Sequence, residues 1–400
     1  MSKFIPFVHN QFQCDLIDEF YAETDLVRVP LNRIDKLTLG SASTELWIDP
    51  AIDGYHTLRK LPSPFKRKRD TGAPGRFLWE QYADYLRQFP NYDVLVHQAP
   101  ELRKIPSMVE GVLDACHQHD PQWLSVPQLP IVNGSANNKI NTALARATSA
   151  WRNKAGYKGK LIVPMILTRY AGQYDKKTLR NANIAELKKC YDRSTADGIW
   201  IVDSDLTDFK GVGTYQKRLE QLVNLHQEVR DKLPNAVLIS GPYWGMNLVL
   251  WARSLCDHPA IAVGSGFRYL VPGMSPKTPK TRIALDSLRR WVQLHPDLRR
   301  WLDSVLSAPP SDIAKAEFEE ILSRFDLFMD FPNHARRQVA EFYGRWIHEH
   351  EKNEQGRALN LFQDLSAAYV VGSQLEELPK SEAPGRRPEV VAQQLMLNCL

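Results

Sequence analysis

The chain has 400 residues, of which 43% are hydrophobic, enough to bury the core of one large domain with additions. Its 51 Lys and Arg against 46 Asp and Glu leave a net charge of +5, which permits a phosphate or nucleic-acid partner without requiring one. The five cysteines are scattered without a CxxC pair and no apolar run approaches about 18 residues, which argues against a zinc cluster, a disulfide framework and a membrane span. The N-terminal segment has acidic residues early and no long apolar stretch, unlike a signal peptide, so the sequence predicts a cytoplasmic protein with no membrane partner.

Seven short runs of apolar, often β-branched residues predict strands, and most are followed by a segment with helical spacing. Runs that are apolar throughout are typical of parallel strands buried on both faces. In chain order the predicted strands are 45–49, 92–96, 123–126, 160–167, 198–203, 236–240 and 260–263. The predicted helices that accompany them are 10–21, 77–89, 107–119, 139–151 (after a polar loop at 133–138), 182–196, 215–233 and 246–255.

This alternation predicts an α/β fold, a (β/α)8 TIM-like barrel, in residues 1–273. An eighth strand has three candidates, at 4–8, 25–29 and 369–371. A doubly wound open sheet has the same local pattern and stays an alternative. Such a sheet more often carries a glycine-rich dinucleotide turn after its first strand, where this chain has Asp49-Pro50-Ala51-Ile52-Asp53-Gly54.

The composition shifts after Gly273. A linker rich in Pro and Lys leads into residues 274–374, where Leu, Trp and Phe recur at three- and four-residue spacing and predict a helical C-terminal region. The helices expected there are 286–292, 297–305, 312–328 and 333–349. Residues 375–400 form a polar, Pro-rich tail whose composition predicts poor order.

Carboxylates follow two of the predicted strands directly. Barrels of this type carry their chemistry at the C-terminal ends of the strands. Asp203 and Asp49 are therefore the candidate catalytic residues, since two opposed carboxylates suit glycosidic-bond chemistry. For both, helix capping or a turn is the structural alternative. Asp205 and Asp53, which follow Asp203 and Asp49 in the sequence, are candidate substrate-binding groups.

The other strand ends supply further candidate substrate-binding residues. Tyr243 and Trp244 would stack on a nucleobase or a sugar, with packing under a loop as the alternative. Gly264, Gly266 and Arg268 would let a substrate approach the backbone and would fix an anion, although a tight turn also explains the glycines. Amide and guanidinium groups after other strands complete the set: Gln98, Gln128 and Arg169.

No set of histidines or cysteines has the spacing of a metal site, and no cofactor motif is present, so the sequence predicts neither. His348 and His350 lie two positions apart in a predicted helix and do not face one metal. A magnesium ion bound by carboxylates alone stays compatible with the sequence.

Basic residues alternate with tryptophans in the predicted helical region. The residues concerned are Arg289, Arg290, Arg299, Arg300, Arg336 and Arg337, with Trp291, Trp301 and Trp346 among them. This pattern favours binding of the phosphate backbone of a nucleic acid. In the alternative interpretation the arginines lie on solvent-exposed helix faces and the tryptophans form the core beneath them. The expected partner is a nucleic acid bound through this basic region, or a protein in a larger complex.

Three strand ends carry a family resemblance. WLSVPQ at 123–128, LIVPMI at 161–166 and IAVGSGF at 261–267 resemble tRNA-guanine transglycosylase-like barrels, including their DNA-modifying relatives. The resemblance covers at most residues 49–273, and the Val263-Gly264 pair and Gln128 are its best points. It implies strand-end aspartates that displace a base and glycine-rich strand ends that hold a 7-deazaguanine. The sequence departs from the family where Asp49–Gly54 replaces a DSGGFQ-type stretch, and the cysteine-rich zinc site is missing.

These observations lead to a functional hypothesis. The chain is expected to be a barrel enzyme, a transglycosylase or glycosidase, that acts on the N-glycosidic bond of a nucleoside or nucleic acid through strand-end carboxylates. One alternative is a non-catalytic protein on a barrel scaffold that binds nucleic acid or joins a complex. Another is a metal-assisted phosphoesterase built from the same carboxylates.

Overall fold

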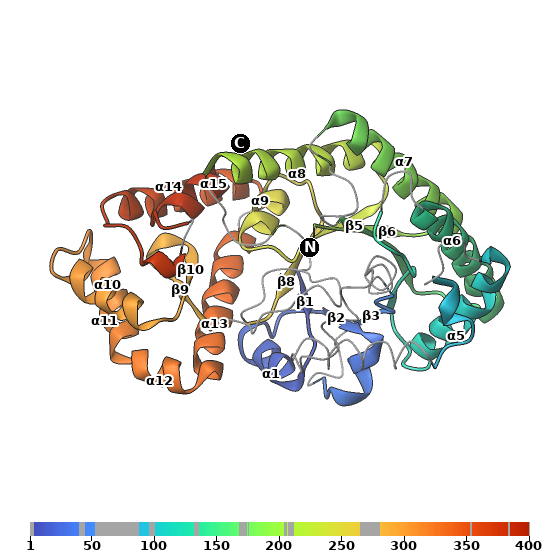
Figure 1. The fold of residues 1–400 in the computed structure, drawn as a ribbon, viewed down its shortest axis with the longest axis horizontal. Coiled ribbons are helices and arrows are strands. Elements are labelled where there is room, and N and C mark those ends of the chain that lie inside the picture. The colour runs from blue at the N-terminus through green and yellow to red at the C-terminus, as the bar shows by residue number, and fades with distance from the viewer. Residues whose placement is uncertain are drawn as a thin grey trace, which may run out of the picture.

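Eight parallel strands close into a barrel, which confirms the predicted (β/α)8 fold (Figure 1). The computed structural model describes residues 4–39, 45–52, 88–95, 101–131, 136–167, 174, 176–203, 206, 212–264, 281–352, 354–382 and 385–399. The barrel strands are β1 (Ile5–Phe7), β2 (Leu26–Pro30), β3 (Glu45–Asp49), β4 (Trp123–Ser125), β5 (Lys160–Leu167), β6 (Gly198–Asp203), β7 (Val237–Ser240) and β8 (His258–Ala262). Because β1 pairs with β8, with Ile5 opposite Ala260 and Phe7 opposite Ala262, the open-sheet alternative is excluded.

The N-terminal part of the barrel differs from the prediction. Both N-terminal candidates for the eighth strand are strands, β1 and β2, and the third candidate lies within a helix. The predicted strand at 92–96 is wrong, because Tyr92–Leu95 forms the 3-10 helix η3. Asn91 adopts a left-handed φ of 55°, and its carbonyl accepts a hydrogen bond from Val94 N–H at 3.1 Å, which coils the chain there.

Side chains from alternate strand positions fill the barrel interior. Phe7, Trp47 and Trp200 meet edge to face, with ring centroids 5.2–5.7 Å apart. Trp123 packs beside Trp47, and the Trp47 indole N–H donates to Ser125 Oγ at 2.9 Å. Successive side chains of a strand point to opposite faces, so the residues next to these point outward to the helices. The lumen is therefore a packed aromatic core.

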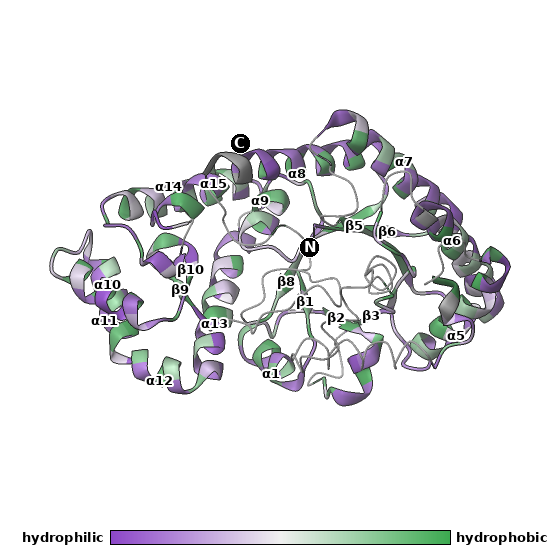
Figure 2. Cartoon of the chain, in the orientation of Figure 1, coloured by the Kyte–Doolittle hydropathy of each residue, from purple (hydrophilic) through white to green (hydrophobic). Residues whose placement is uncertain are grey.

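Helices cover the outside of the barrel. They and the 3-10 helices are α1 (Gln11–Phe20), η1 (Leu31–Lys36), η4 (Leu102–Lys104), α5 (Ile105–His117), α6 (Ala136–Ala155), α7 (Lys177–Ser194), α8 (Val212–Lys232) and α9 (Met246–Ala252). Figure 2 shows large hydrophilic stretches on α6 and α7. Within the described residues, no helix combines the length and apolarity that a membrane span needs. The predicted helix at 77–89 lies outside these residues, apart from its last two positions, which form a turn.

The C-terminal region is a helical layer beside the barrel (Figure 1). It contains β9 (Arg282–Leu285), η5 (Asp286–Leu288), β10 (Arg290–Gln293), α10 (Pro296–Leu306), α11 (Asp312–Ser323), α12 (Phe325–Asp330), α13 (Pro332–Glu351), α14 (Arg357–Ser373), η6 (Lys380–Glu382) and α15 (Val390–Met396). The helix predicted at 286–292 is wrong, because β9 and β10 pair as an antiparallel hairpin across that stretch. Arg289 takes the left-handed φ of 48° that reverses the chain.

Much of the C-terminal tail is folded in its described residues, 375–382 and 385–399, contrary to the poor order expected for residues 375–400. Helix α15 buries Val390, Val391 and Leu395 and packs against α14 and α8. The Arg253 guanidinium, just beyond α9, donates to the Asn398 carbonyl at 2.9 Å. The composition-based prediction missed α15 because the polar, Pro-rich stretch 375–388 dominates the tail, whereas most of its apolar residues are gathered in 390–400.

An aromatic cluster joins the barrel to α13. The Trp244 ring, which follows β7, stacks on Phe342 with centroids 5.6 Å apart and planes 13° apart. Tyr343 and Trp346 surround it at 5.2 and 6.2 Å. The indole N–H of Trp244 donates to the Arg289 carbonyl at 2.9 Å. Trp244 thus connects three separate segments of the chain.

Truncation of this residue tests the connection. We expect Trp244→Ala to lower the free energy of unfolding by about 3–5 kcal/mol, because it removes a buried indole from a tightly packed cluster. Phe331→Ala is the control, since Phe331 is 58% exposed. Urea denaturation measures both, and equal losses in the two variants would contradict the proposed importance of the cluster.

Candidate active site at the barrel mouth

Asp49 points into the barrel at the C-terminal end of β3. It stands two residues after Trp47, whose ring fills the lumen, so the two side chains share the inner face. One carboxylate oxygen forms an ion pair with Arg28 of β2, and the other accepts a hydrogen bond from Ala51 N–H at 3.0 Å. Both side chains are buried: that of Asp49 is 6% exposed and that of Arg28 is 1% exposed.

The Arg28 guanidinium lies against the aromatic core of the lumen. Its central carbon is 4.6 Å from the Phe7 ring centroid and 5.2 Å from that of Trp200. The mouth of the barrel, meaning the C-terminal ends of its strands, therefore contains a buried carboxylate and a guanidinium that pack against two aromatic rings. A buried ion pair is weak evidence for stability, because desolvation offsets much of its attraction. A pair of this kind at the C-terminal end of a barrel is instead a candidate for function.

Asp203 points the other way, toward the helices. Val202 belongs to the lumen core, so its neighbour Asp203 faces outward. The carboxylate is fully buried, and its Oδ2 accepts hydrogen bonds from Tyr174 Oη at 2.7 Å and from two nitrogens of Arg218 on α8 at 2.8 and 2.6 Å. Burial and the adjacent Asp203 charge raise the pKa of Tyr174 well above its usual value. The structure therefore does not bring Asp49 and Asp203 together as a facing pair of carboxylates.

The two aromatic residues after β7 have separate surroundings. Tyr243 lies beside Asp203, because its hydroxyl accepts a hydrogen bond from the Asp203 backbone N–H at 2.7 Å. Its side chain ties the end of β6 to the segment after β7. Trp244 lies in the cluster with α13, which fits the packing alternative. Tyr243 and Trp244 are 2% and 5% exposed, so neither ring has an open face for stacking on a base.

The remaining predicted site residues divide by position. Gln128 is buried after β4 and donates to the Asn141 carbonyl at 3.2 Å. Gly264 follows β8 with a φ of 92°, a conformation that favours glycine, which fits the tight-turn reading. The others lie outside the described residues: Asp53, Gln98, Arg169, Asp205, Gly266 and Arg268.

The sequence-based prediction missed three residues that organise this end of the barrel. Arg28 interrupts an otherwise apolar strand, LVRVP, and a lone charge in a buried run was the signal that could have identified it. Arg218 and Tyr174 carry no comparable signal. They are found only because the fold brings α8 and the segment before α7 to the end of β6.

The arginines of the C-terminal region already have partners. Arg289 pairs with Asp286, Glu349 and Asp364, and the buried Arg290 donates to backbone carbonyls of the tail. Arg299, Arg300 and Arg337 pair with Asp326, Asp297 and Glu19, and Arg336 donates to Asn333. The three tryptophans named with them, Trp291, Trp301 and Trp346, are buried. Binding of nucleic acid to this region stays a prediction.

A cavity of about 450 Å³ lies in the C-terminal region, between η5, α11, α12, α13 and α14. Glu317 of α11 accepts hydrogen bonds there from the backbone N–H groups of Asp286 and Ser287. Burial raises the pKa of Glu317 to about 7, although these hydrogen bonds act in the opposite direction. Arg289 also lines the cavity; burial opposes its charge, but Asp364 and Asp286 more than offset this, so its pKa is raised.

Among the described residues, one group of side chains is close enough together to hold a metal ion: Glu23, His348 and Glu351. Glu23 precedes β2, so this group lies toward the N-terminal end of the barrel strands and away from the mouth. It is separate from the Asp49–Arg28 pair at the C-terminal end.

Comparison with solved structures finds a barrel of another family. The chain matches 2,3-dimethylmalate lyase, a PEP mutase/isocitrate lyase superfamily member, with a TM-score of 0.36 and 10% identity over 65% of this chain and 75% of the lyase. No protein-family model and no curated protein sequence matches the chain. A likeness at this level concerns the barrel architecture, and it transfers nothing about the lyase's reaction.

The resemblance to tRNA-guanine transglycosylase-like barrels is corrected by this comparison. The matched structure belongs to the PEP mutase/isocitrate lyase superfamily, and no family model supports a transglycosylase assignment. The three quoted motifs have a simpler origin in β4, β5 and β8. LIVPMI lies within β5, WLSVPQ begins in β4, and IAVGSGF begins at the end of β8, so their apolar residues are those that buried parallel strands of any such barrel require.

The Arg28–Asp49 pair gives a stability prediction. We expect Arg28→Met to lower the free energy of unfolding by about 3–5 kcal/mol, because it leaves the Asp49 carboxylate buried without its cation. The double variant Arg28→Met/Asp49→Leu should recover most of that loss. Urea denaturation of the four proteins of the cycle measures the effect, and a double variant no more stable than Arg28→Met would contradict it.

The raised pKa of Glu317 predicts a pH dependence of stability. Since the folded state keeps the Glu317 proton up to about pH 7 whereas the ordinary value is 4.5, this residue makes stability fall as pH rises from 4.5 to 7. We expect Glu317→Gln to flatten the stability profile in that window, measured by urea denaturation at several pH values. Glu320→Gln, at an exposed position of the same helix, should leave the profile unchanged. A slope that survives in Glu317→Gln would show that other groups cause it.

Proposed function

We propose that the chain is a barrel enzyme that acts on the N-glycosidic bond of a nucleoside or of a nucleotide unit in a nucleic acid, with Asp49 as its catalytic carboxylate. The supporting observation is the buried Asp49–Arg28 pair, directed inward at the C-terminal end of the barrel. Active sites of enzymes with this architecture lie at that end.

The surroundings of Asp49 suit a carboxylate that meets a developing positive charge. Arg28 and the Ala51 N–H fix both of its oxygens, so the group is oriented before a substrate arrives. In the proposed step a carboxylate oxygen bonds to the anomeric carbon while the C–N bond breaks and its electron pair leaves with the base. The base takes a proton from solvent, and water or a second base then displaces Asp49 from the sugar.

Asp203 has a positioning role in this proposal. Its carboxylate holds Arg218 and Tyr174, and its backbone N–H holds the Tyr243 hydroxyl. These bonds fix the end of β6 to the segments that follow β5 and β7, all of which lie at the rim of the mouth. Asp203 would thus shape the approach to Asp49 without touching the reacting atoms.

A second candidate function is binding without chemistry. The observation that favours it is that both aspartates are already ion-paired, Asp49 with Arg28 and Asp203 with Arg218. In that case the barrel is a scaffold for a nucleic-acid or protein partner. The two functions differ in whether a covalent product forms.

The enzymatic proposal is tested by measuring base release. The purified full chain is incubated with ribonucleosides, deoxyribonucleosides, and single- and double-stranded DNA and RNA oligonucleotides, with and without a radiolabelled free purine. We expect release or exchange of a base with at least one of these, detected by liquid chromatography. Asp49→Asn should lower that rate by about 1,000-fold or more, because it removes the attacking carboxylate.

Asp35→Asn is the matched control, since the Asp35 side chain is 82% exposed on the outside of the barrel. Circular dichroism verifies that each variant is folded. Full activity in Asp49→Asn would overturn the catalytic assignment. Salt-sensitive binding of the oligonucleotides with no base released would favour the scaffold function.

A further inference from the structure

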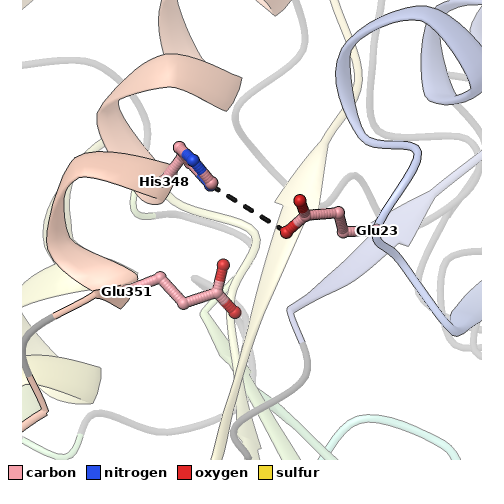
Figure 3. A group of neighbouring side chains, drawn as sticks. All are labelled: Glu23, His348 and Glu351. Atoms are coloured by element: carbon pink, nitrogen blue, oxygen red, sulfur yellow. Dashed lines mark ion pairs between the residues drawn. The ribbon is translucent and has the colours of Figure 1, made fainter.

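Three metal-ligating side chains meet where α13 crosses the turn between α1 and β2. His348 and Glu351 lie one helical turn apart on α13, and Glu23 faces them from the turn (Figure 3). One potential ligand atom from each residue lies within 4.8 Å of the other two. His348 Nδ1 is 3.9 Å from a carboxylate oxygen of Glu23. The cluster therefore offers one imidazole nitrogen and two carboxylates to a single point.

Contacts outside the cluster hold its two halves together. The Tyr21 hydroxyl donates to the Ala340 carbonyl of α13 at 2.9 Å, and Glu19 pairs with Arg337. The two segments also approach closely at Gly344, where an added Cβ would lie 2.8 Å from the Phe20 carbonyl oxygen. These bonds fix the two backbone segments in advance of any ion, whereas the side chains of His348 and Glu23 are 49% and 75% exposed and are free to rotate toward one.

The charges in the cluster are unbalanced. Glu23 and Glu351 are two carboxylates held near each other, with a histidine as the third member of the group. The Arg357 guanidinium lies over the Trp251 ring at 3.7 Å and donates to the His350 carbonyl. A divalent cation between the two carboxylates would relieve their repulsion.

We propose that Glu23, His348 and Glu351 form a binding site for a divalent transition-metal ion, with Zn²⁺ as the best match. Zn²⁺ binds imidazole nitrogen and carboxylate oxygen at about 2.0–2.2 Å and takes four ligands, so water completes the set. The imidazole disfavours Mg²⁺ and Ca²⁺, which prefer oxygen ligands. Ligand atoms of a tetrahedral site at these bond lengths lie about 3.3–3.5 Å apart, so rotation of the three side chains has to shorten the present spacing, which is at most 4.8 Å.

This site would link the two parts of the molecule. Glu23 belongs to the barrel, and the other two ligands belong to the C-terminal region. A bound ion would add a cross-link between α13 and the segment before β2, beside the Tyr21 and Arg337 contacts. Its expected consequence is a higher thermal stability of the folded chain.

Metal binding by the full chain tests the proposal. After treatment with a chelator and its removal, isothermal titration with ZnCl₂ should give one saturable site, and Zn²⁺ should raise the Tm in a thermal scan. MgCl₂ and CaCl₂ should have no comparable effect. Co²⁺, used as a spectroscopic substitute, should show the visible absorption of a four-coordinate ion.

Single-ligand variants locate the site. His348→Ala, Glu351→Gln and Glu23→Gln should each weaken Zn²⁺ binding by at least about tenfold and abolish the gain in Tm. His334→Ala is the matched control, because His334 is an exposed histidine of the same helix. Circular dichroism establishes that the variants are folded. Absence of binding, or Zn²⁺ binding that all three ligand variants retain, would overturn the proposal and mark any bound zinc as adventitious.

Discussion

The pairing of β1 with β8 is the constraint on which the rest of the structure depends. It closes the sheet, so that no strand of the barrel is left with an unpaired edge. It also fixes the register, with Ile5 opposite Ala260. A register shift of one residue would move every side chain of a strand to the opposite face. Closure therefore decides which polar groups enter the lumen and which face the helices.

The consequence is clearest for the two aspartates at the strand ends. Asp49 shares the inner face with Trp47, and Arg28 reaches it from the neighbouring strand over the rings of the lumen. Asp203 lies on the outer face of β6, where Arg218 and Tyr174 donate hydrogen bonds to its carboxylate. Both carboxylates are buried and ion-paired, but Asp49 faces the barrel lumen and Asp203 faces the surrounding helices. The candidate active site is accordingly one carboxylate with one guanidinium, and the second carboxylate organises the rim.

The C-terminal region is bound to the barrel by contacts that are far apart in sequence. Trp244 packs with Phe342, Tyr343 and Trp346, and α15 returns to α14 and α8. A prediction from local composition treated Trp244 as a ligand-binding residue with packing as the alternative, and treated the tail as poorly ordered. Trp244 depends on α13, about 100 residues further along, and α15 depends on its packing against α14 and the still more distant α8, which local patterns cannot identify. The hairpin β9–β10 was missed for another reason: its apolar residues also have helical spacing, and the left-handed turn at Arg289 that pairs the two strands leaves no mark in that spacing.

The sequence by itself determined the alternation of buried strands and helices, and the β1–β8 pairing then decided for the barrel against an open sheet. The runs at 160–167 and 198–203 are apolar because parallel strands covered on both faces must be, and their alternation with amphipathic helices predicted the barrel. It also identified Asp49 and Asp203 as strand-end carboxylates. Only the tertiary structure decided that both N-terminal candidates are strands, that Tyr92–Leu95 coils into η3, and that the two carboxylates face apart. The reason is physical: strand propensity is local, whereas the face that a side chain occupies depends on a register set by hydrogen bonds between distant segments.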